Sequence, residues 1–431
     1  MTIFGRHLSH SARPTLVGTL LALALVNVAP PTISGAVVPL IAQSAPLPHD
    51  ASTVPQAILN SVTCTAKGYC VAVGRYLSSS QSRALIDTEV HGVWLRTQTI
   101  KMPVNAYHGA NGTLFSVSCS SPGNCVAVGQ YQNRKSTGNP TNIVVNGPLI
   151  VAEKNGVWGT GIMAPQPAGA QNSSVTSLNS VSCPKFNNCV AVGEMKTAQS
   201  NKAFTVRQKN GKWGDALIVK LPNWAKPNFI TQLDGVSCVA VGFCVAVGQY
   251  VNKSPSRQTL VVTETKGVWG VGHTIPLPTS VRNPWAGLFS VKCLKWGLCM
   301  AVGVVQSPPD GGQGLIAMEY KGKWKTGILA PLPKGLPKTA SSSDQLASIS
   351  CTSFGFCNAV GQYTQGLFDQ GVTITETKGK WARGTVVPRP AGAVAPPYVG
   401  LGGVSCTSPG ACVMVGQYQA NVGDLALIVT H

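Results

Sequence analysis

Charged residues are scarce in this chain, and acidic residues are the scarcest among them. Of 431 residues only 11% are charged, against roughly 25% in typical soluble domains. Lys and Arg together number 33 against 14 Asp and Glu, so the formal net charge is +19. An excess of cations favours acidic partners, among them anionic polysaccharide, wall polymers and acidic lipid surfaces. General adaptation of the surface to its medium would explain the same charge.

Helical periodicity and long apolar runs are missing after residue 36. No later stretch repeats its apolar residues every 3.6 positions, and none is long and apolar enough to cross a bilayer. The chain is instead rich in turn formers, with 47 Gly and 30 Pro, and 44% of its residues are hydrophobic. This composition predicts an all-β protein with many short strands and a sizeable core.

The sequence signs of several enzyme classes are absent. There is no Gly-x-Ser-x-Gly elbow and no Walker loop, and the seven His are scattered without metal-ligand spacing. We therefore expect no metal, no cofactor and no assignable catalytic residue. Glycosidase chemistry needs two carboxylates within about 5–10 Å of each other. Acids that do not recur regularly along the chain could supply such a pair: Asp87, Glu194, Asp234, Asp310, Asp344, Asp369 and Asp424.

Residues 1–36 are predicted to be a secretory signal peptide. Two Arg form a basic start, residues 16–28 are a short apolar run, and Ser34-Gly35-Ala36 offers small residues for cleavage. An uncleaved N-terminal anchor is the alternative. Cleavage after residue 36 would leave 31 Lys and Arg against 14 acids, a charge of +17. We expect a secreted protein, either free or associated with the cell wall.

The 14 cysteines form seven pairs with one fixed spacing, C-x5-C. Each pair belongs to a repeated phrase, of which Ser116-Val117-Ser118-Cys119, followed by Cys125-Val126-Ala127-Val128-Gly129, is one copy. Behind a signal peptide this even count predicts disulfides, because a five-residue loop between two strands brings the flanking Cys to bridging distance. Zinc is disfavoured because structural zinc sites usually have C-x2-4-C spacing. The predicted bridges are Cys64–Cys70, Cys119–Cys125, Cys183–Cys189, Cys238–Cys244, Cys293–Cys299, Cys351–Cys357 and Cys406–Cys412.

Each repeat continues in the same order over about 55 residues. A Val-Ala-Val-Gly strand follows the second Cys, then a polar loop, an apolar strand, a tight Gly-x-Trp turn and a fourth strand ending in a Pro-rich phrase. Four-stranded units repeated four to eight times are typical of a β-propeller. We predict seven blades of antiparallel strands A to D, with one disulfide each. The blades are expected near 58–105, 113–165, 178–222, 233–278, 288–333, 346–389, and 401–431 completed by 37–48.

The two ends of the chain predict how the ring closes. The seventh repeat stops at His431 after its third strand, without a Trp turn or a fourth strand. The missing phrase lies near the start, where Ala45-Pro46-Leu47-Pro48 matches Ala330-Pro331-Leu332-Pro333. We therefore predict that residues 37–46 supply the outer strand of blade seven and pair with residues 425–430, which removes exposed sheet edges.

This arrangement resembles seven-bladed propellers of the WD40 and Asp-box kinds. The SVSC-x5-CVAVG phrase is also similar to that of uncharacterised secreted repeat proteins of actinobacteria. The resemblance covers residues 37–431 and implies the fold and its closure, with little about function. The Lys266-Gly267-Val268-Trp269 turn lies where Asp-box families carry their motif, yet the Asp and the Ser or Thr of that motif are absent. A sialidase-type activity is disfavoured accordingly.

Residues that recur from blade to blade are predicted to be architectural. One acidic position recurs two residues before the tight turn, and a Gln-Tyr pair recurs at the end of strand B, where we expect packing or rim contacts. The acidic position is occupied by Glu89, Glu153, Gln208, Glu264, Glu319 and Glu376, and the pairs are Gln130-Tyr131, Gln249-Tyr250, Gln362-Tyr363 and Gln417-Tyr418.

Function is expected in the loops that differ between blades. In a propeller the B–C and D–A loops share one face, and the A–B and C–D turns share the other. The variable loops of the first face carry aromatic rings, which stack on sugars, and cations, which pair with carboxylate, sulfate or phosphate. Capping of the D–A loops against the blades is the alternative role for the aromatics. The candidate ligand-binding residues are Tyr107, His108, Arg134, Trp224, Lys226, Arg282, Trp285 and Tyr398.

Three functions remain open from the sequence. The first is a secreted binding propeller for anionic polysaccharide or cell-wall polymer, acting through the variable loops. The second is an extracellular scaffold for protein interaction or adhesion. The third is a polysaccharide hydrolase or lyase, for which Asp87, Asp310, Asp369 and Asp424 would converge at the mouth of the central channel. The expected partner is thus an anionic polymer or an extracellular protein rather than nucleic acid.

Overall fold

The chain divides into two units, Met1–Val38 and Pro39–His431, and the computed structural model describes only the second. Described are residues 39–79, 81–95, 99–135, 143–170, 173–197, 200–226, 229–281, 284–306, 311–331, 333, 344–365, 368–395 and 398–431, without the side chains of 134, 135, 143, 173, 174 and 365. The predicted signal peptide lies outside these residues and stays a prediction. The described part contains no helix suited to crossing a membrane.

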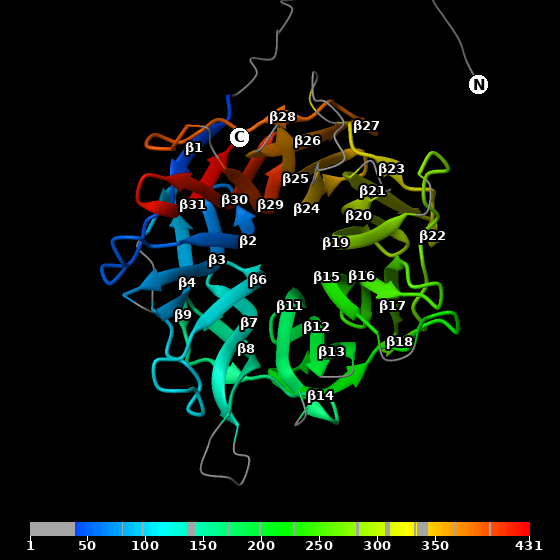
Figure 1. The fold of residues 1–431 in the computed structure, drawn as a ribbon, viewed down its shortest axis with the longest axis horizontal. Helices are drawn as coiled ribbons and strands as arrows, with labels where there is room; N and C mark the ends of the chain where they lie inside the picture. The colour runs from blue at the N-terminus through cyan, green and yellow to red at the C-terminus, as the bar shows by residue number, and fades with distance from the viewer. Residues whose placement is uncertain are drawn as a thin grey trace, which may run out of the picture. The chain divides into compact units, whose positions relative to one another are not determined.

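The described residues form antiparallel blades in chain order, as predicted (Figure 1). Blade 1 is β2 (Ile58–Ala66), β3 (Tyr69–Ser78), β4 (Gln81–Val90) and β5 (Val93–Trp94); blade 2 is β6 (Gly112–Ser121), β7 (Asn124–Lys135), β8 (Ile143–Lys154), β9 (Val157–Trp158) and β10 (Ile162–Met163). Blade 3 is β11 (Ser173–Lys185), β12 (Asn188–Thr197), β13 (Asn201–Lys209) and β14 (Lys212–Ile218); blade 4 is β15 (Thr231–Ala240), β16 (Phe243–Val251), β17 (Arg257–Thr265) and β18 (Val268–Trp269). Blade 5 is β19 (Trp285–Lys295), β20 (Leu298–Gln306), β21 (Gly312–Tyr320), β22 (Lys323–Trp324) and β23 (Ile328–Leu329); blade 6 is β24 (Gln345–Ser353), β25 (Phe356–Gln365), β26 (Phe368–Thr377), β27 (Lys380–Trp381) and β28 (Thr385–Val386); blade 7 is β29 (Val399–Ser408), β30 (Ala411–Ala420), β31 (Gly423–Thr430) and β1 (Ile41–Ser44).

The innermost strands of the blades meet side by side around a centre. Strand β2 contacts β6, and the contacts continue through β11, β15, β19, β24 and β29 back to β2 (Figure 1). Small residues allow this convergence. The Gly that ends each Val-Ala-Val-Gly strand is required, because a Cβ at Gly248 would collide with the backbone oxygen of Gln232 in the neighbouring strand.

The ring is closed by the N-terminal strand, as the sequence predicts. Strand β1 pairs antiparallel with β31, in a register that places Ile41 opposite Thr430 and Ser44 opposite Leu427. The backbone N–H of Ala45 adds a 2.8 Å bond to the carbonyl of Ala426. The observed strand is shorter than the predicted 37–46, whose first two residues lie outside the described part.

The outer strands are shorter than the sequence suggests. Outside blades 3 and 7, strand D begins as a two-residue pair at the tight turn, such as β18, and in blades 2, 5 and 6 a second short pair follows. In blade 3 it is one seven-residue strand, β14. An outer strand has a partner on one side only, and short outer strands limit edge-to-edge association.

All seven predicted disulfides form, and each joins the two ends of an A–B turn. The Ser that precedes the first Cys has a role that the sequence analysis did not recognise. Its hydroxyl accepts a hydrogen bond from the backbone N–H of the first Cys in the next blade, at 2.9–3.0 Å. Five such bonds link neighbouring blades: Ser118 to Cys183, Ser182 to Cys238, Ser237 to Cys293, Ser350 to Cys406 and Ser405 to Cys64.

The two loop faces are arranged as predicted. In six blades a backbone hydrogen bond joins an A–B turn and a C–D turn, for example from Gly267 N–H to Gly242 O at 2.9 Å. Both residues are glycines in five of these blades, and in blade 3 Gly211 donates to Asn187 O. We call this the hairpin face. On the opposite side, B–C and D–A loops bond to each other, for example from Lys226 N–H to Val251 O at 2.9 Å. We call this the variable-loop face.

The recurring acids are buried inside the blades, as expected of architectural residues. Each lies opposite the Trp of its own tight turn, as Glu264 lies opposite Trp269. Burial raises the pKa of the carboxyl in Glu89, Glu153, Glu319 and Glu376. In blade 4 the acid forms an ion pair instead, because Arg207 of blade 3 reaches Glu264.

Candidate functional site

Trp224 occupies a position that recurs in the D–A loops. The side chain located 26 residues before the strand-B Tyr bonds to the hydroxyl of that buried Tyr: Tyr76 donates to Asp50, and Tyr131 donates to Asn105. At the same separation the indole nitrogen of Trp224 donates to Tyr250 Oη at 2.7 Å. Trp224 therefore caps its blade through the indole N–H, while its ring remains exposed.

The B–C loop of blade 4 connects Trp224 to Trp285. The backbone N–H of Lys253 donates to Trp224 O at 3.0 Å. On the other side, Ser256 Oγ donates to Pro284 O at 3.0 Å, next to Trp285 at the start of β19. Both Trp thus flank one short loop on the variable-loop face. The structure brings these two sequence-predicted residues together.

Cations lie among the exposed rings of this region. Lys226 Nζ lies 3.9 Å from the ring centroid of Phe229, and the Arg257 guanidinium carbon lies 5.8 Å from that of Trp285. Side chains of Trp224, Phe229 and Trp285 are 55%, 42% and 45% exposed. Exposed Lys253 and Arg257 come from the loop between the two Trp. We call this set (Trp224, Lys226, Phe229, Lys253, Arg257 and Trp285) the blade 4–5 patch.

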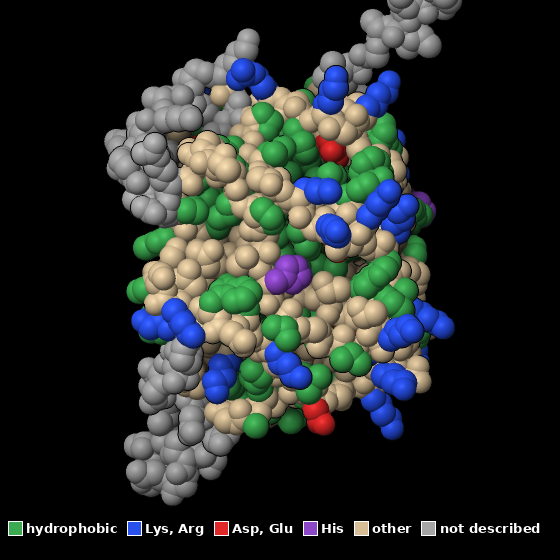
Figure 2. All heavy atoms as spheres, turned by 90° about the vertical axis from the view of Figure 1, so that its right-hand side faces the viewer, with side chains coloured by type: hydrophobic (Ala, Val, Ile, Leu, Met, Phe, Trp, Pro, Cys, Tyr) green, Lys and Arg blue, Asp and Glu red, His purple; other side chains and the backbone are tan. Residues whose placement is uncertain are grey.

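Phe229 was missed by the sequence analysis, because a Phe in an irregular loop carries no periodic signal. The excess of cations over acids is visible beyond the patch as well. Figure 2 shows one side of the molecule on which Lys and Arg far outnumber Asp and Glu. An anion that approaches such a surface encounters attraction before it contacts any single residue.

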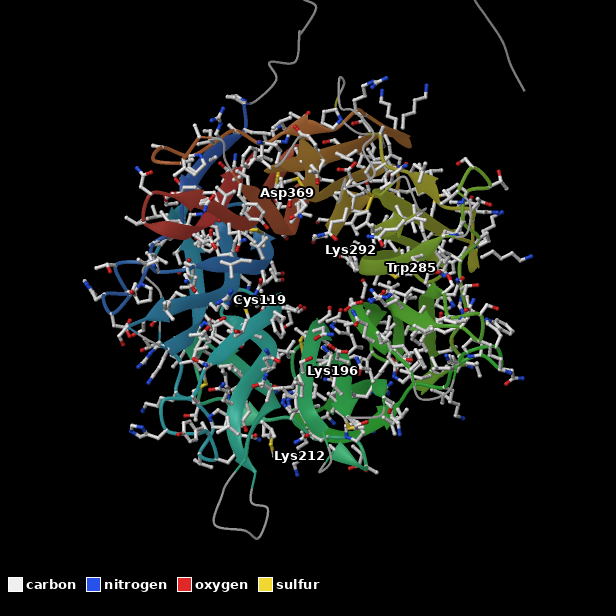
Figure 3. All side chains as sticks on the ribbon, viewed as in Figure 1. Cys119, Lys196, Lys212, Trp285, Lys292 and Asp369 are labelled. Atoms are coloured by element: carbon white, nitrogen blue, oxygen red, sulfur yellow. A yellow bond between two sulfur atoms is a disulfide. The ribbon has the colours of Figure 1, made fainter. Side chains whose placement is uncertain are left out.

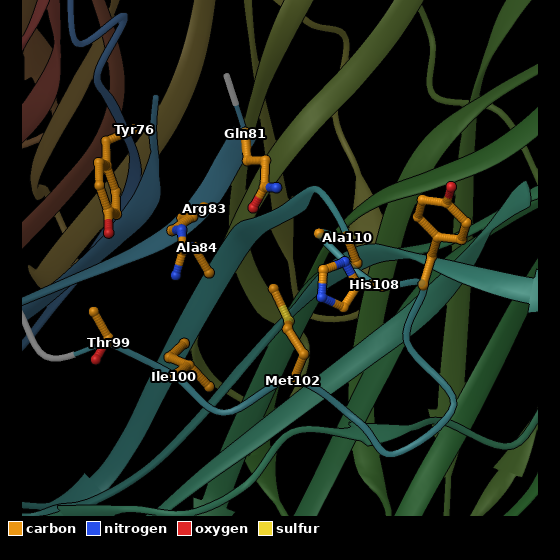
Figure 4. Close-up of a pocket in the computed structure, with 11 residues that line it drawn as sticks. Tyr76, Gln81, Arg83, Ala84, Thr99, Ile100, Met102, His108 and Ala110 are labelled. Atoms are coloured by element: carbon orange, nitrogen blue, oxygen red, sulfur yellow. The ribbon is translucent and has the colours of Figure 1, made fainter. Parts of the chain in front are cut away.

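Tyr107 and His108 lie elsewhere on the same face. They line a hollow of about 390 Å³ at blade 1 and the loop leading to blade 2, together with Gln81, Arg83 and Met102 (Figure 4). Because this hollow belongs to blades 1 and 2, it does not share a groove with the blade 4–5 patch. It remains a separate candidate for ligand contact.

Tyr398 is placed in an acidic environment rather than a cationic one. Its pKa is raised by burial and by the nearby charges of Asp369 and Asp424. Asp369 accepts hydrogen bonds from Gln362 Nε2 at 3.0 Å and Thr364 Oγ1 at 2.9 Å. A site for an anion is therefore disfavoured at Tyr398. The remaining candidates, Arg282 and the side chain of Arg134, lie outside the described residues, as does Asp310.

A second set of charges lies where β12 of blade 3 contacts β15 of blade 4. Lys196 Nζ is 2.9 Å from Glu194 Oε1, and Asp234 on β15 accepts two hydrogen bonds from Gln232 Nε2 at 2.9 and 3.1 Å. Burial, reinforced by the charge of Glu194, raises the pKa of Asp234 to about 7. Glu194 and Asp234 were both named from the sequence, but they are not among the acids expected to converge at the channel mouth. Of those acids, Asp87 is fully buried in blade 1, whereas Asp369 and Asp424 both lie near Tyr398.

Lys292 on β19 was also missed. It lies on the inner strand of blade 5, at the position that holds Ser or Thr in the other six blades (Figure 3). Its side chain reaches solvent, yet the surrounding protein lowers the pKa of its ammonium group by desolvation. Alignment of the seven copies position by position would have revealed this exception.

Comparisons with known proteins find only distant similarities to this chain. No family model matches it, and no curated protein matches it. Similar solved structures include a protein of unknown function from Dyadobacter fermentans (9% identity, 90% of this chain and 97% of the other, TM-score 0.47). They also include a Trypanosoma rangeli sialidase bound to the inhibitor DANA (12%, 90% and 57%, TM-score 0.41) and a fucose-specific lectin from Aleuria aurantia (12%, 80% and 100%, TM-score 0.41). Likenesses this distant carry no conclusion about what the chain binds.

Proposed function

We propose that this chain is a secreted propeller that binds an anionic polysaccharide or cell-wall polymer through the blade 4–5 patch. The observation that carries the proposal is the set of three exposed rings, Trp224, Phe229 and Trp285, with cations placed against two of them. Sugar rings stack on such aromatic faces, and their carboxylate, sulfate or phosphate groups pair with Lys and Arg.

The patch is held by a rigid support. Trp224 is bonded to a buried Tyr, and the loop between the two Trp is fixed at one end by a backbone bond and at the other by the Ser256 hydroxyl. Little conformational freedom would therefore be lost when a polymer binds.

Secretion is part of the proposal. Seven disulfides need an oxidising compartment to form and persist, and the N-terminal 36 residues have the pattern of a signal peptide. Expression with the native N-terminus, followed by sequencing of the exported chain, tests this directly. We expect an N-terminus close to residue 37.

The binding proposal is tested by a screen of the mature protein against anionic and neutral polysaccharides and isolated wall polymers. We expect binding to anionic polymers that weakens as salt rises, because charge pairs at a surface are screened. Binding to neutral polymers alone, or to none, would overturn the proposal. Retention by an extracellular protein with no polymer binding would instead support the scaffold function.

A further inference from the structure

One groove of the hairpin face is filled by a cation of the chain itself. Arg207 on β13 reaches from blade 3 into blade 4, where it forms an ion pair with Glu264, a fully buried acid. The same guanidinium donates a 3.2 Å hydrogen bond to the carbonyl oxygen of Gly267 in the C–D turn. Blade 4 thus offers a buried carboxylate and a turn carbonyl as acceptors for a guanidinium group.

The groove between blades 1 and 2 has the same acceptors without the cation. Glu153 and Gly156 correspond to Glu264 and Gly267, because Glu153 lies opposite Trp158 as Glu264 lies opposite Trp269. The residue that corresponds to Arg207 is Thr88. Each stands one position before the residue that faces the Trp of the tight turn, which is Gln208 in blade 3 and Glu89 in blade 1.

This second groove is open. Its volume is about 390 Å³, and it is lined by Thr88, Glu89, Glu153, Gly156 and three cysteines, Cys70, Cys119 and Cys125. Glu89 and Glu153 are 7% and 5% exposed, and Oε2 of each has no hydrogen-bond partner among the described residues. A buried acceptor without a partner is costly, so a donor that enters the groove would be bound favourably.

We propose that the groove between blades 1 and 2 binds a guanidinium group carried on a short aliphatic chain. The guanidinium would occupy the place that Arg207 takes in the groove between blades 3 and 4, paired with Glu153 and the carbonyl of Gly156. The aliphatic chain would pack against Val71, Val90 and Leu95, which line the same hollow. The group can come from a free alkylguanidine or from an Arg side chain of a peptide.

Calorimetric titration with butylguanidinium tests the proposal, with the neutral butylurea of nearly the same shape as the reference ligand. We expect butylguanidinium to bind at least ten-fold more tightly. Glu153→Gln should reduce its affinity at least ten-fold, since it removes the charge. Gln is compatible with this position, because Gln208 occupies it in blade 3. Glu376→Gln makes the same change in blade 6, where Met318 of blade 5 takes the position of Thr88, and should leave the affinity unchanged.

A second variant tests the proposal without removing the Glu153 carboxylate. Thr88→Arg should fill the groove with the chain's own guanidinium, abolish butylguanidinium binding and raise the melting temperature. Thr88→Gln, similar in length but uncharged, should not raise it. Equal affinity for butylguanidinium and butylurea, or full binding in both Glu153→Gln and Thr88→Arg, would overturn the proposal. Tighter binding of a blocked Gly-Arg-Gly peptide than of butylguanidinium identifies the peptide as the source, and the reverse identifies the free compound.

Discussion

The indole nitrogen of Trp224 donates a 2.7 Å hydrogen bond to the buried hydroxyl of Tyr250, while the indole ring stays exposed. The indole N–H thus caps the blade, one of the two roles that the sequence left as alternatives, and the exposed ring is free for the other, the proposed contact with a ligand. Asp50 and Asn105 make the corresponding bond in other blades with side chains that offer no ring. The cap alone does not need a Trp, which leaves the ring available for recognition.

Substitution Trp224→Phe should separate the two roles. The Phe keeps an aromatic face but loses the N–H donor, so we expect a loss of about 1 kcal/mol in the free energy of unfolding and nearly unchanged polymer binding. Trp224→Ala should lose both stability and binding. Urea denaturation and a binding assay on the two variants provide the comparison. Equal binding by all three proteins would exclude the ring from the ligand site.

The hydrogen bonds between blades should have a measurable energy. Ser237→Ala removes the acceptor for the buried N–H of Cys293, and an unsatisfied buried donor costs about 1–3 kcal/mol. Ser280→Ala, at an exposed loop position, is the matched control and should change the free energy of unfolding by less than about 0.5 kcal/mol. If the two variants unfold at the same urea concentration, the bonds between blades do not stabilise the ring.

Lys292 is the natural exception to this pattern, and its replacement should stabilise the protein. Lys292→Ser would supply blade 5 with the hydroxyl that five other inner strands use, in reach of the Cys351 N–H, for a gain of about 0.5–1.5 kcal/mol. Thermal unfolding measures the effect against Lys295→Ser, an exposed Lys on the same strand. A lower melting temperature for Lys292→Ser would show that Lys292 itself makes a stabilising contact.

Asp234 should make stability fall as the pH rises from about 4 to about 7. Its pKa is near 7 in the folded protein against 3.8 for an ordinary Asp, so the folded state binds the extra proton between these values. Asp234→Asn removes the effect, and the stability of this variant relative to the wild type should increase between pH 4 and pH 8, by on the order of 1–4 kcal/mol. A difference that stays constant over this range would show that Asp234 titrates normally.

The sequence predicts the architecture well because the repeats carry it. Seven Cys pairs at one spacing define the A–B turns, and the unmatched phrase at Ala45 indicates the pairing seen between Ile41 and Thr430. Because the Cys pairs recur, the strand assignment in each repeat is supported by the same assignment in the others. The resemblance to the WD40 and Asp-box kinds stays a prediction beyond the shared propeller architecture.

The candidate site is predicted less well because loops have no period. Trp224 and Trp285 come together only because the short loop of blade 4 spans the distance between them. Tyr398 has the same residue type as Tyr107, yet the structure surrounds it with acids from other strands. The pairing of Glu194 with Asp234 depends on how two blades are offset, which no spacing within one repeat reveals.

The measurement that tests the proposed function most directly compares two equally exposed Trp on opposite faces. Trp285 on the variable-loop face and Trp296 on the hairpin face are each 45% exposed. We expect Trp285→Ala to weaken binding of an anionic wall polymer at least ten-fold, and Trp296→Ala to leave it unchanged, at both 50 mM and about 300 mM salt. Equal affinities for the two variants, or a loss in Trp296→Ala alone, would contradict a binding site on blades 4 and 5.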